Sequence, residues 1–470
     1  MTALAVTRNV PALTAALAAS LACGLVIASG RPVIALAALL FAAGLLLVRR
    51  PGVVLALFLG SVILLEGDRQ GFFAVGGQFY DRLAPPFVPT DLLLLLLAVS
   101  VAADLRTRGL DVRTPGSLTL PLVLLATAVC IGSATGYLDG GSVGHIVDSV
   151  RVLAYLVITP FLVVNVVRTD EDVRRVLIAG GLVAVFKGVA GTAAWVAGQG
   201  RPFGGTTLTY YEPATNFLML VFLLTVAAAV LARAPLHRWV LWGVPPVAIA
   251  LTLSFRRSFW IAAVLGLLLV LLLSRGSTPK LLFVGATSVV AALALAISHG
   301  GATANETSSG VVERATSLRP ERIRSATEDR YRLVEQRNVV AALRDHPVTG
   351  LGMGVPWEIR YPLPERHKDE TFYTHTVTLW YWLKLGLAGL ISYLLLMAVA
   401  IRSSYRIFRL HPEALVACAG LGLVAAFCGL VVVETTGSFT GVSLRFTIVL
   451  AAILGVMATA ERAFQRTASR

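Results

Sequence analysis

Long apolar runs separated by short polar connections fill most of the 470-residue chain. A helix needs about 20 apolar residues to cross the roughly 30 Å hydrocarbon core of a bilayer, and runs near this length recur along the sequence. The pattern predicts an all-α polytopic membrane protein with about 12 to 14 transmembrane helices. The predicted segments are 11–29, 33–48, 52–65, 88–104, 118–136, 148–167, 176–197, 214–232, 239–254, 259–274, 281–298, 376–401, 413–434 and 443–460.

The positions of the basic residues predict the orientation of these helices. Short loops on the cytoplasmic side are rich in Lys and Arg, whereas short loops that are translocated to the outer side contain few of them. With the N-terminus inside, most basic residues between helices fall in the inner connections, and only a few, such as Arg201, Arg256 and Arg257, fall in the outer ones. Both termini are therefore expected in the cytoplasm.

One hydrophilic stretch, residues 299–374, interrupts the apolar pattern and lies on the outer face in this topology. It carries as many basic as acidic side chains. A capping-box pattern at Ser325 and Glu328 predicts a helix over roughly 326–344, which makes this outer loop partly helical. The predicted domains are an N-terminal transmembrane bundle (1–298), an extracytoplasmic loop subdomain (299–375), and C-terminal transmembrane helices with a cytoplasmic tail (376–470).

Three glycines at alternate positions, Gly350, Gly352 and Gly354, follow the predicted outer helix. Glycine permits backbone conformations and close approaches that other residues do not. The spacing therefore predicts a tight turn or a close approach of two backbones in this part of the loop.

Composition supports a membrane protein and narrows its function. The chain is 56% hydrophobic and 14% charged, and its mean hydropathy of +0.78 lies outside the range of soluble globular proteins. The net charge of +14 comes mostly from basic residues in the connections that are expected on the cytoplasmic side. Nucleic-acid binding would require a basic, water-exposed domain, and the sequence pattern shows none. The four cysteines lie inside apolar runs, so no disulfide framework, metal site or cofactor is predicted.

Two adjacent arginines, Arg256 and Arg257, occupy a very short outer turn between two predicted helices. Basic residues are disfavoured on this side of the membrane, so a pair of them indicates an anionic partner. The partner is either a diphosphate substrate, whose oxygens a guanidinium binds well, or lipid headgroups or a structural ion pair.

The predicted outer helix carries a second set of arginines. Arg330, Arg337 and Arg344 are spaced by seven residues and so share one face. Such a stripe suits phosphate oxygens. A solvated or salt-bridged helix face is the alternative, because acidic residues such as Glu335 are adjacent.

Four further positions are candidates for substrate contact. Lys187 lies midway along an apolar segment, where it either lines a substrate cavity or pairs with a neighbouring helix. The outer connection that begins at Arg201 mixes aromatic, acidic and amide groups, including Tyr211 and Asn216. Aromatic and hydrogen-bonding side chains together suit a sugar, although interfacial tyrosines are common in membrane proteins.

His375 stands where the hydrophilic loop re-enters the membrane. An imidazole exchanges a proton near neutral pH, so His375 is a candidate to activate an acceptor hydroxyl at the membrane surface. A structural role is the alternative for a single interfacial histidine.

In their order along the chain these elements resemble the superfamily of O-antigen ligases and polymerases. Three elements are each similar to a family pattern. They are the arginine turn followed by aromatic residues, the histidine-proline stretch with its glycines, and the histidine that precedes a glycine-leucine segment. Two positions depart from them, because Thr376 replaces an asparagine and Lys384 an acidic residue. The matching segments are Leu253–Trp260, His346–Gly354 and His375–Leu390, with Pro213–Asn216 as a weaker match.

The resemblance implies an inverting, metal-independent glycosyltransferase. It implies that a glycan passes from a polyprenyl diphosphate, undecaprenyl or decaprenyl, to a hydroxyl of a glycan or glycolipid acceptor. His375 would be the general base. The reaction would take place on the outer face of the cytoplasmic membrane of a bacterium, among membrane lipids. The diphosphate and substrate ligands would come from Arg256, Arg257, Arg330, Arg337, Arg201, Lys187, Tyr211 and Asn216.

Two other functions remain open at the level of sequence. A polymerase of the same superfamily would join lipid-linked repeat units with the same donor chemistry. A lipid-linked glycan flippase or transporter would also have many helices, but it should show paired repeats and charged groups near the membrane midplane. Neither the acceptor nor the oligomeric state follows from the sequence.

Overall fold

The fold is described from a computed structural model of the chain. The residues it describes are 48–65, 88–197, 201–203, 206–208, 212–274, 327–363 and 371–468. The predicted segments 11–29 and 281–298, and all but the last residue of 33–48, lie outside these ranges.

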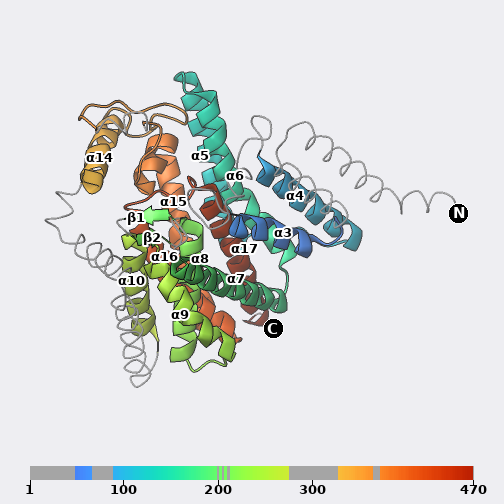
Figure 1. Cartoon of the computed structure of the whole chain (residues 1–470). Coiled ribbons are helices and arrows are strands. Elements are labelled where there is room, and N and C mark those ends of the chain that lie inside the picture. Colours follow the sequence, from blue (N-terminus) through green and yellow to red (C-terminus); the bar gives the residue numbers. More distant parts are fainter. Residues whose placement is uncertain are drawn as a thin grey trace, which may run out of the picture.

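The described chain is helical apart from one small antiparallel hairpin of β1 (Arg201–Phe203) and β2 (Thr206–Leu208). This confirms the predicted all-α class (Figure 1). The helices are α3 (Pro51–Leu64), α4 (Pro89–Arg108), the 3-10 turn η2 (Gly116–Leu118), α5 (Thr119–Leu138), α6 (Val143–Val166), α7 (Asp170–Val196), α8 (Pro213–Leu231), α9 (Arg238–Thr252), α10 (Arg257–Leu273), α14 (Thr327–Asp345), α15 (Val377–Leu410), α16 (Ala414–Val433) and α17 (Leu444–Ala468).

Within the described ranges, seven helices are long and apolar enough to cross a membrane. They are α5 together with η2, α6, α7, α8, α15, α16 and α17. Helices α3 and α10 are apolar but shorter. The protein is therefore a polytopic, multi-pass membrane protein, as the apolar pattern predicted.

Each predicted apolar segment that falls in the described ranges is a helix, and several of these helices are longer than predicted, α6 and α15 among them. Helix α6 starts five residues before the predicted 148 because its polar first turns remain helical, with Arg151 Nη1 3.2 Å from Asp148 Oδ1. This local ion pair accounts for the charge of Arg151. Helix α15 continues past 401 through a basic final stretch that ends at Leu410.

The helices pack around α16 and α17. Helix α17 lies along α6, and α16 contacts α8, α10 and α15. Helix α14 lies beside α15 at one end of the bundle (Figure 1). Small residues allow close packing: a Cβ at Gly188 in α7 would lie 2.7 Å from the Cα of Val247 in α9. Such small-residue contacts are the usual means by which helices associate in lipid.

Polar contacts join helix ends in two separate regions, as expected when successive helices cross a membrane in alternating directions. In one region, Arg406 of α15 pairs with Glu461 of α17 at 2.8 Å. In the other, Arg445 at the start of α17 donates from Nε to the carbonyl of Val62 at the end of α3 (2.8 Å) and lies 3.6 Å from Glu212 at the start of α8.

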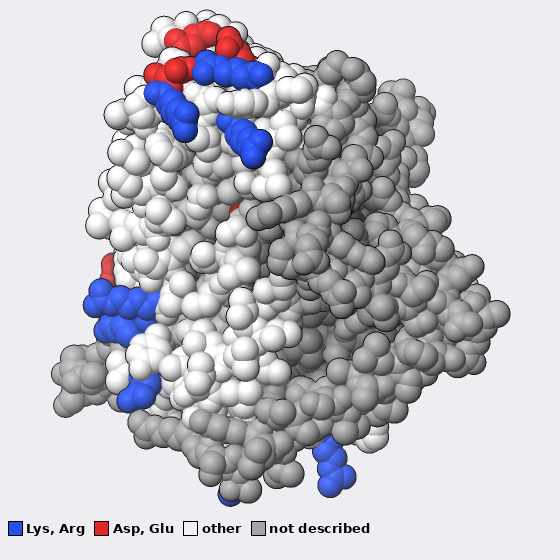
Figure 2. Space-filling model, turned by 90° about the vertical axis from the view of Figure 1, so that its left-hand side faces the viewer, with Lys and Arg blue, Asp and Glu red and all other residues white. Residues whose placement is uncertain are grey.

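In Figure 2, the charged residues of the described surface are also concentrated in separate regions. Charged side chains gather at the top and toward the bottom of this face, and the surface between them is largely uncharged. An uncharged belt between two charged ends is the surface that a bilayer requires.

Residues 346–357, called the strap below, cross the end of the bundle after α14. Met353 N donates to the carbonyl of Gly132 in α5 at 2.9 Å, and Leu351 N donates to the carbonyl of Leu383 in α15 at 2.7 Å. The strap therefore binds two transmembrane helices through its backbone and fixes the loop subdomain to the bundle.

The three alternate glycines of the strap all have positive φ: 66° at Gly350, 85° at Gly352 and 75° at Gly354. A Cβ at Gly352 would lie 2.4 Å from the backbone N of Gly136 in α5. The structure thus confirms the predicted turn and close backbone approach, and both depend on the missing side chain.

Where the strap meets α15, the helix is interrupted at Gly386, whose φ of 67° and ψ of −168° are not helical. Leu387 N donates to the carbonyl of Val348 in the strap at 2.8 Å, which replaces a hydrogen bond inside the helix. The prediction of an uninterrupted helix over 376–401 was therefore wrong at this residue, because the strap competes for the backbone groups of α15.

We predict that Gly352→Ala lowers the melting temperature of the purified protein in detergent more than Gly140→Ala does. Both glycines have positive φ, 85° and 75°, but a Cβ at Gly140 would meet nothing within 4 Å. The difference between the two variants therefore measures the strap contact alone. Equal shifts in melting temperature would contradict the packing role of the strap.

Candidate functional site

The turn that carries the paired arginines has a strained backbone. Phe255 has a φ of 52°, an unusual value for a bulky residue, and such a conformation costs about 1–3 kcal/mol. Its side chain is buried beside Trp260, at a ring-centroid distance of 6.4 Å. The buried ring holds the turn in this conformation and places Arg256 directly before α10.

Arg256 contacts the loop between α16 and α17, residues 434–443, called the α16–α17 loop below. Its Cζ lies 5.4 Å from the centre of the Phe439 ring, within the range of a cation–π contact. Phe439 also packs against Phe259 and Phe446. Arg256 thus rests on a rigid aromatic group, and Arg257 follows it, half-buried, as the first residue of α10.

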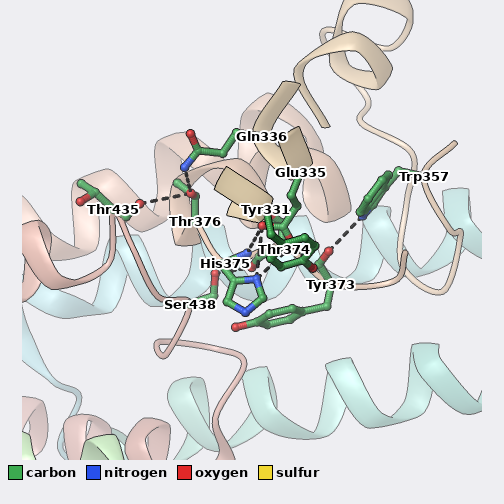
Figure 3. A network of polar contacts seen from close by, with 10 residues as sticks. All are labelled: Tyr331, Glu335, Gln336, Trp357, Tyr373, Thr374, His375, Thr376, Thr435 and Ser438. Carbon is green, nitrogen blue, oxygen red and sulfur yellow. Dashed lines mark hydrogen bonds and ion pairs between the residues drawn. The ribbon is translucent and has the colours of Figure 1, made fainter. Parts of the chain in front are cut away.

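Backbone and side-chain contacts hold the segment around His375 from both sides. Trp357 of the strap donates from Nε1 to the carbonyl of Tyr373 at 2.9 Å. Ser438 of the α16–α17 loop donates to the carbonyl of Thr374 at 2.6 Å. Val377 N then donates to the carbonyl of Glu434 at 3.1 Å. The position of His375 is therefore fixed by the loop subdomain and by the transmembrane bundle together (Figure 3).

His375 forms a pair with Glu335 of α14. The carboxylate accepts a hydrogen bond from the backbone N of His375 at 3.0 Å and lies 3.1 Å from its Nδ1. The Glu335 side chain is fully buried, and that of His375 is 24% exposed. Figure 3 shows the imidazole pointing toward the carboxylate.

Two tyrosines complete the surroundings of the pair. Tyr331, one turn before Glu335 in α14, donates from its hydroxyl to Glu335 Oε1 at 3.3 Å. The ring of Tyr373 lies edge-on to the imidazole, at a centroid distance of 4.8 Å. Burial and the Glu335 carboxylate raise the pKa of the Tyr373 phenol to about 12, so this group stays neutral near pH 7.

This arrangement suits proton abstraction by the imidazole. When Nδ1 donates its hydrogen to the carboxylate, Nε2 at the opposite edge of the ring carries a lone pair. None of the described residues forms a hydrogen bond with Nε2, and the ring is partly exposed. A buried carboxylate stabilises the positive charge that the ring gains with a proton. Within the described ranges, no group of three or more His, Cys, Asp or Glu side chains is arranged so that it could hold a metal ion.

The α16–α17 loop brings the base candidate and the arginine turn together. Ser438 binds the segment that carries His375, and the next residue, Phe439, lies beneath Arg256. Arg256 and Thr374, the residue before His375, are far apart in the sequence and thus contact neighbouring residues of one short loop.

The other predicted site residues are not joined to this cluster by the described contacts. Arg337 is exposed on α14, away from the buried face that carries Glu335. Asn216 is buried in the first turn of α8, where its Nδ2 donates to the carbonyl of Glu212 at 3.1 Å. Lys187 is buried within α7. Tyr211 and the side chains of Arg201 and Arg330 lie outside the described parts of the chain.

Glu335 was not predicted as a site residue, although the sequence holds a signal for it. Tyr331, Val339 and Ala342 form the buried face of α14, and Glu335 falls in the middle of that face. A carboxylate at a core-facing helix position needs a partner. In the sequence, Glu335 stands out only as an acidic neighbour of the arginines, which favours a salt-bridged helix face, and the buried face of α14 was not predicted.

The two residues that depart from the family patterns both make structural contacts. Thr376 accepts a hydrogen bond from Gln336 of α14 at 2.8 Å and donates to the carbonyl of Thr435 at 3.2 Å, so it joins α14 to the α16–α17 loop. Lys384 is buried in α15 and donates to the carbonyl of Val355 in the strap.

The fold and the site together define a multi-pass membrane protein with an acid–base cluster at one end of its helix bundle. Residues 242–394 match the sequence model of a family described as O-antigen ligase. This match confirms the resemblance and supports membership of the O-antigen ligase and polymerase superfamily. No curated protein matches the chain at a significant level.

The matched segment contains Arg256, Glu335 and His375. It runs from α9 through the strap into α15 and ends before the α16–α17 loop begins. The match supports a glycan-transfer function of the O-antigen ligase kind.

We predict that His375→Ala destabilises the protein and that adding Glu335→Gln restores part of the loss. Removing the imidazole leaves a fully buried carboxylate without this donor, which costs on the order of 1–3 kcal/mol. The amide of glutamine removes the buried charge. Thermal unfolding of both single variants and the double variant measures the coupling. Additive effects would contradict a paired His375 and Glu335.

Proposed function

We propose that the protein is a membrane glycosyltransferase of the O-antigen ligase type. It transfers a glycan from a polyprenyl diphosphate to an acceptor hydroxyl on the outer face of the bacterial cytoplasmic membrane. The observation that carries the proposal is the pairing of His375 with the buried Glu335 inside the segment that matches the family.

His375 acts as the general base in this proposal. Its Nε2 takes the proton of the acceptor hydroxyl, and the oxygen attacks the anomeric carbon of the glycan from the face opposite the diphosphate. The bond between the anomeric carbon and the diphosphate oxygen breaks, and its electron pair leaves with the polyprenyl diphosphate. One displacement of this kind inverts the anomeric configuration. Glu335 holds the ring and stabilises the imidazolium that forms.

Arginines stabilise the leaving diphosphate. Negative charge grows on the diphosphate as the bond breaks, and a preorganised cation at that point lowers the barrier. Arg256 is the first candidate because the Phe439 ring supports its guanidinium close to the segment that carries His375. The remaining predicted ligands, which we retain as substrate contacts, are Arg257, Arg330, Arg337, Arg201, Lys187, Tyr211 and Asn216.

The membrane position of the site suits a lipid-linked donor. Residues 371–376, which include His375 and are called the re-entry segment from here on, lie directly before α15, at the border between the loop subdomain and a membrane-spanning helix. A donor with its tail among the helices and its diphosphate at the surface would meet this border. The distribution of basic residues supports an orientation with this end outside the cell and both termini in the cytoplasm.

The proposal is tested by the release of polyprenyl diphosphate from a lipid-linked oligosaccharide by the purified protein, with a panel of acceptors. Release should depend on the acceptor. His375→Ala should lower the rate by about 10²–10⁴-fold, the usual contribution of a positioned general base. Arg256→Ala should lower the rate by about 10²–10³-fold, the usual effect of removing one hydrogen-bond donor that stabilises an oxyanion.

Two variants serve as matched controls. His237→Ala changes an exposed histidine before α9, and Arg238→Ala changes the exposed arginine that begins α9. Both should retain the wild-type rate. Acceptor-independent release, or a His375→Ala variant as active as His237→Ala, would refute the proposed mechanism. The product separates the two family activities: a ligase attaches one finished chain, whereas a polymerase forms a ladder of lengths.

A further inference from the structure

A second buried carboxylate lies behind the site. Glu434, the first residue after α16, is 1% exposed. Its Oε1 accepts a hydrogen bond from Thr440 N at 2.7 Å, and its Oε2 accepts one from the hydroxyl of Tyr393 in α15. Unlike Glu212, which faces Arg445, Glu434 has no basic partner among the ion pairs of the described residues.

A carboxyl group in this position is energetically unfavourable unless its hydrogen bonds compensate for the lost water. The two side-chain contacts of Glu434 reach two different elements. Thr440 lies in the α16–α17 loop, so Glu434 draws the far part of that loop back onto the end of α16. Tyr393 anchors the same carboxylate to α15. The carboxylate thus closes the loop and joins it to the helix that follows His375.

The loop is also braced from the side of α15. The ring of Tyr381 stacks on that of Tyr393, with centroids 4.7 Å apart. Gly441, whose φ is 77°, lies against Tyr381: a Cβ there would be 2.5 Å from the tyrosine hydroxyl oxygen. The loop therefore has little room to move once Glu434 holds it.

The closed loop makes the contacts that place both halves of the site. Ser438 holds the carbonyl before His375, and the carbonyl of Thr435 accepts from Thr376, the residue after it. Phe439 lies beneath the guanidinium of Arg256. All three contacts come from residues between Glu434 and Thr440, the two ends of the hydrogen-bonded closure.

We propose that Glu434 is a positioning residue that fixes the base His375 relative to the cation Arg256. The inference rests on the proposed glycosyl transfer. In that reaction the acceptor oxygen and the leaving diphosphate lie on opposite sides of one carbon, so the base and the cation must keep a set separation. A displacement of about 1 Å can cost on the order of 10²-fold in rate. Glu434 acts through the loop and does not contact the substrates.

The test compares Glu434→Ala with Glu434→Gln in the acceptor-dependent release assay on the full-length protein. Alanine removes both closure contacts, and kcat should fall by about 10²-fold while the KM for the donor changes little. Glutamine can accept from Thr440 N and hydrogen-bond with Tyr393, so it should restore most of kcat. Glu413→Gln, at the other end of α16, is the matched control and should have the wild-type rate.

Hydrogen–deuterium exchange separates this inference from the proposed function, because it requires no turnover. Glu434→Ala should speed exchange in both 371–377 and 434–443, and Glu434→Gln should not. This result would support the positioning role even if the wild type transferred no glycan. Unchanged exchange in 371–377, a Glu434→Ala variant with the wild-type kcat, or a Glu434→Gln variant as slow as alanine would overturn it.

Discussion

The site depends on the burial of the Glu335 carboxylate between α14 and the re-entry segment. A fully buried carboxylate must be satisfied by donors, and here they come from the backbone and imidazole of His375 and from Tyr331. The same contacts that satisfy Glu335 dock α14 onto the transmembrane bundle. The interaction therefore helps to position both α14 and the histidine, and it leaves Nε2 of the imidazole available to take a proton.

Other segments at the same end of the bundle support this pair. The strap reaches α5 and α15 through backbone contacts that only glycine allows at Gly352, and its Trp357 holds the carbonyl of Tyr373. The α16–α17 loop supports the opposite side through Ser438 and carries Phe439 beneath Arg256. Helix α14, the strap and the α16–α17 loop thus converge on one short stretch of backbone at the border between loop and membrane.

Much of this architecture could be predicted from sequence, because apolar runs of membrane length leave few alternatives to helices. The arginine turn, the glycine strap and His375 could be singled out from local chemistry. Glu335 could not be paired with His375, because the pairing depends on the face of α14 that docks. The break at Gly386 was missed because it results from hydrogen bonds with the distant strap. The α16–α17 loop carries few charges, so its link between Arg256 and His375 appears only in three dimensions.

The central claim is that His375 and Glu335 act as one unit in catalysis, and a kinetic double-mutant cycle tests it most directly. The measured quantity is kcat for acceptor-dependent release of polyprenyl diphosphate by the wild type, His375→Ala, Glu335→Gln and the double variant. Residues that act as a unit are strongly non-additive. The account predicts that Glu335→Gln is slow and that the double variant is no slower than His375→Ala. Losses that multiply in the double variant, or a Glu335→Gln variant as fast as the wild type, would contradict it.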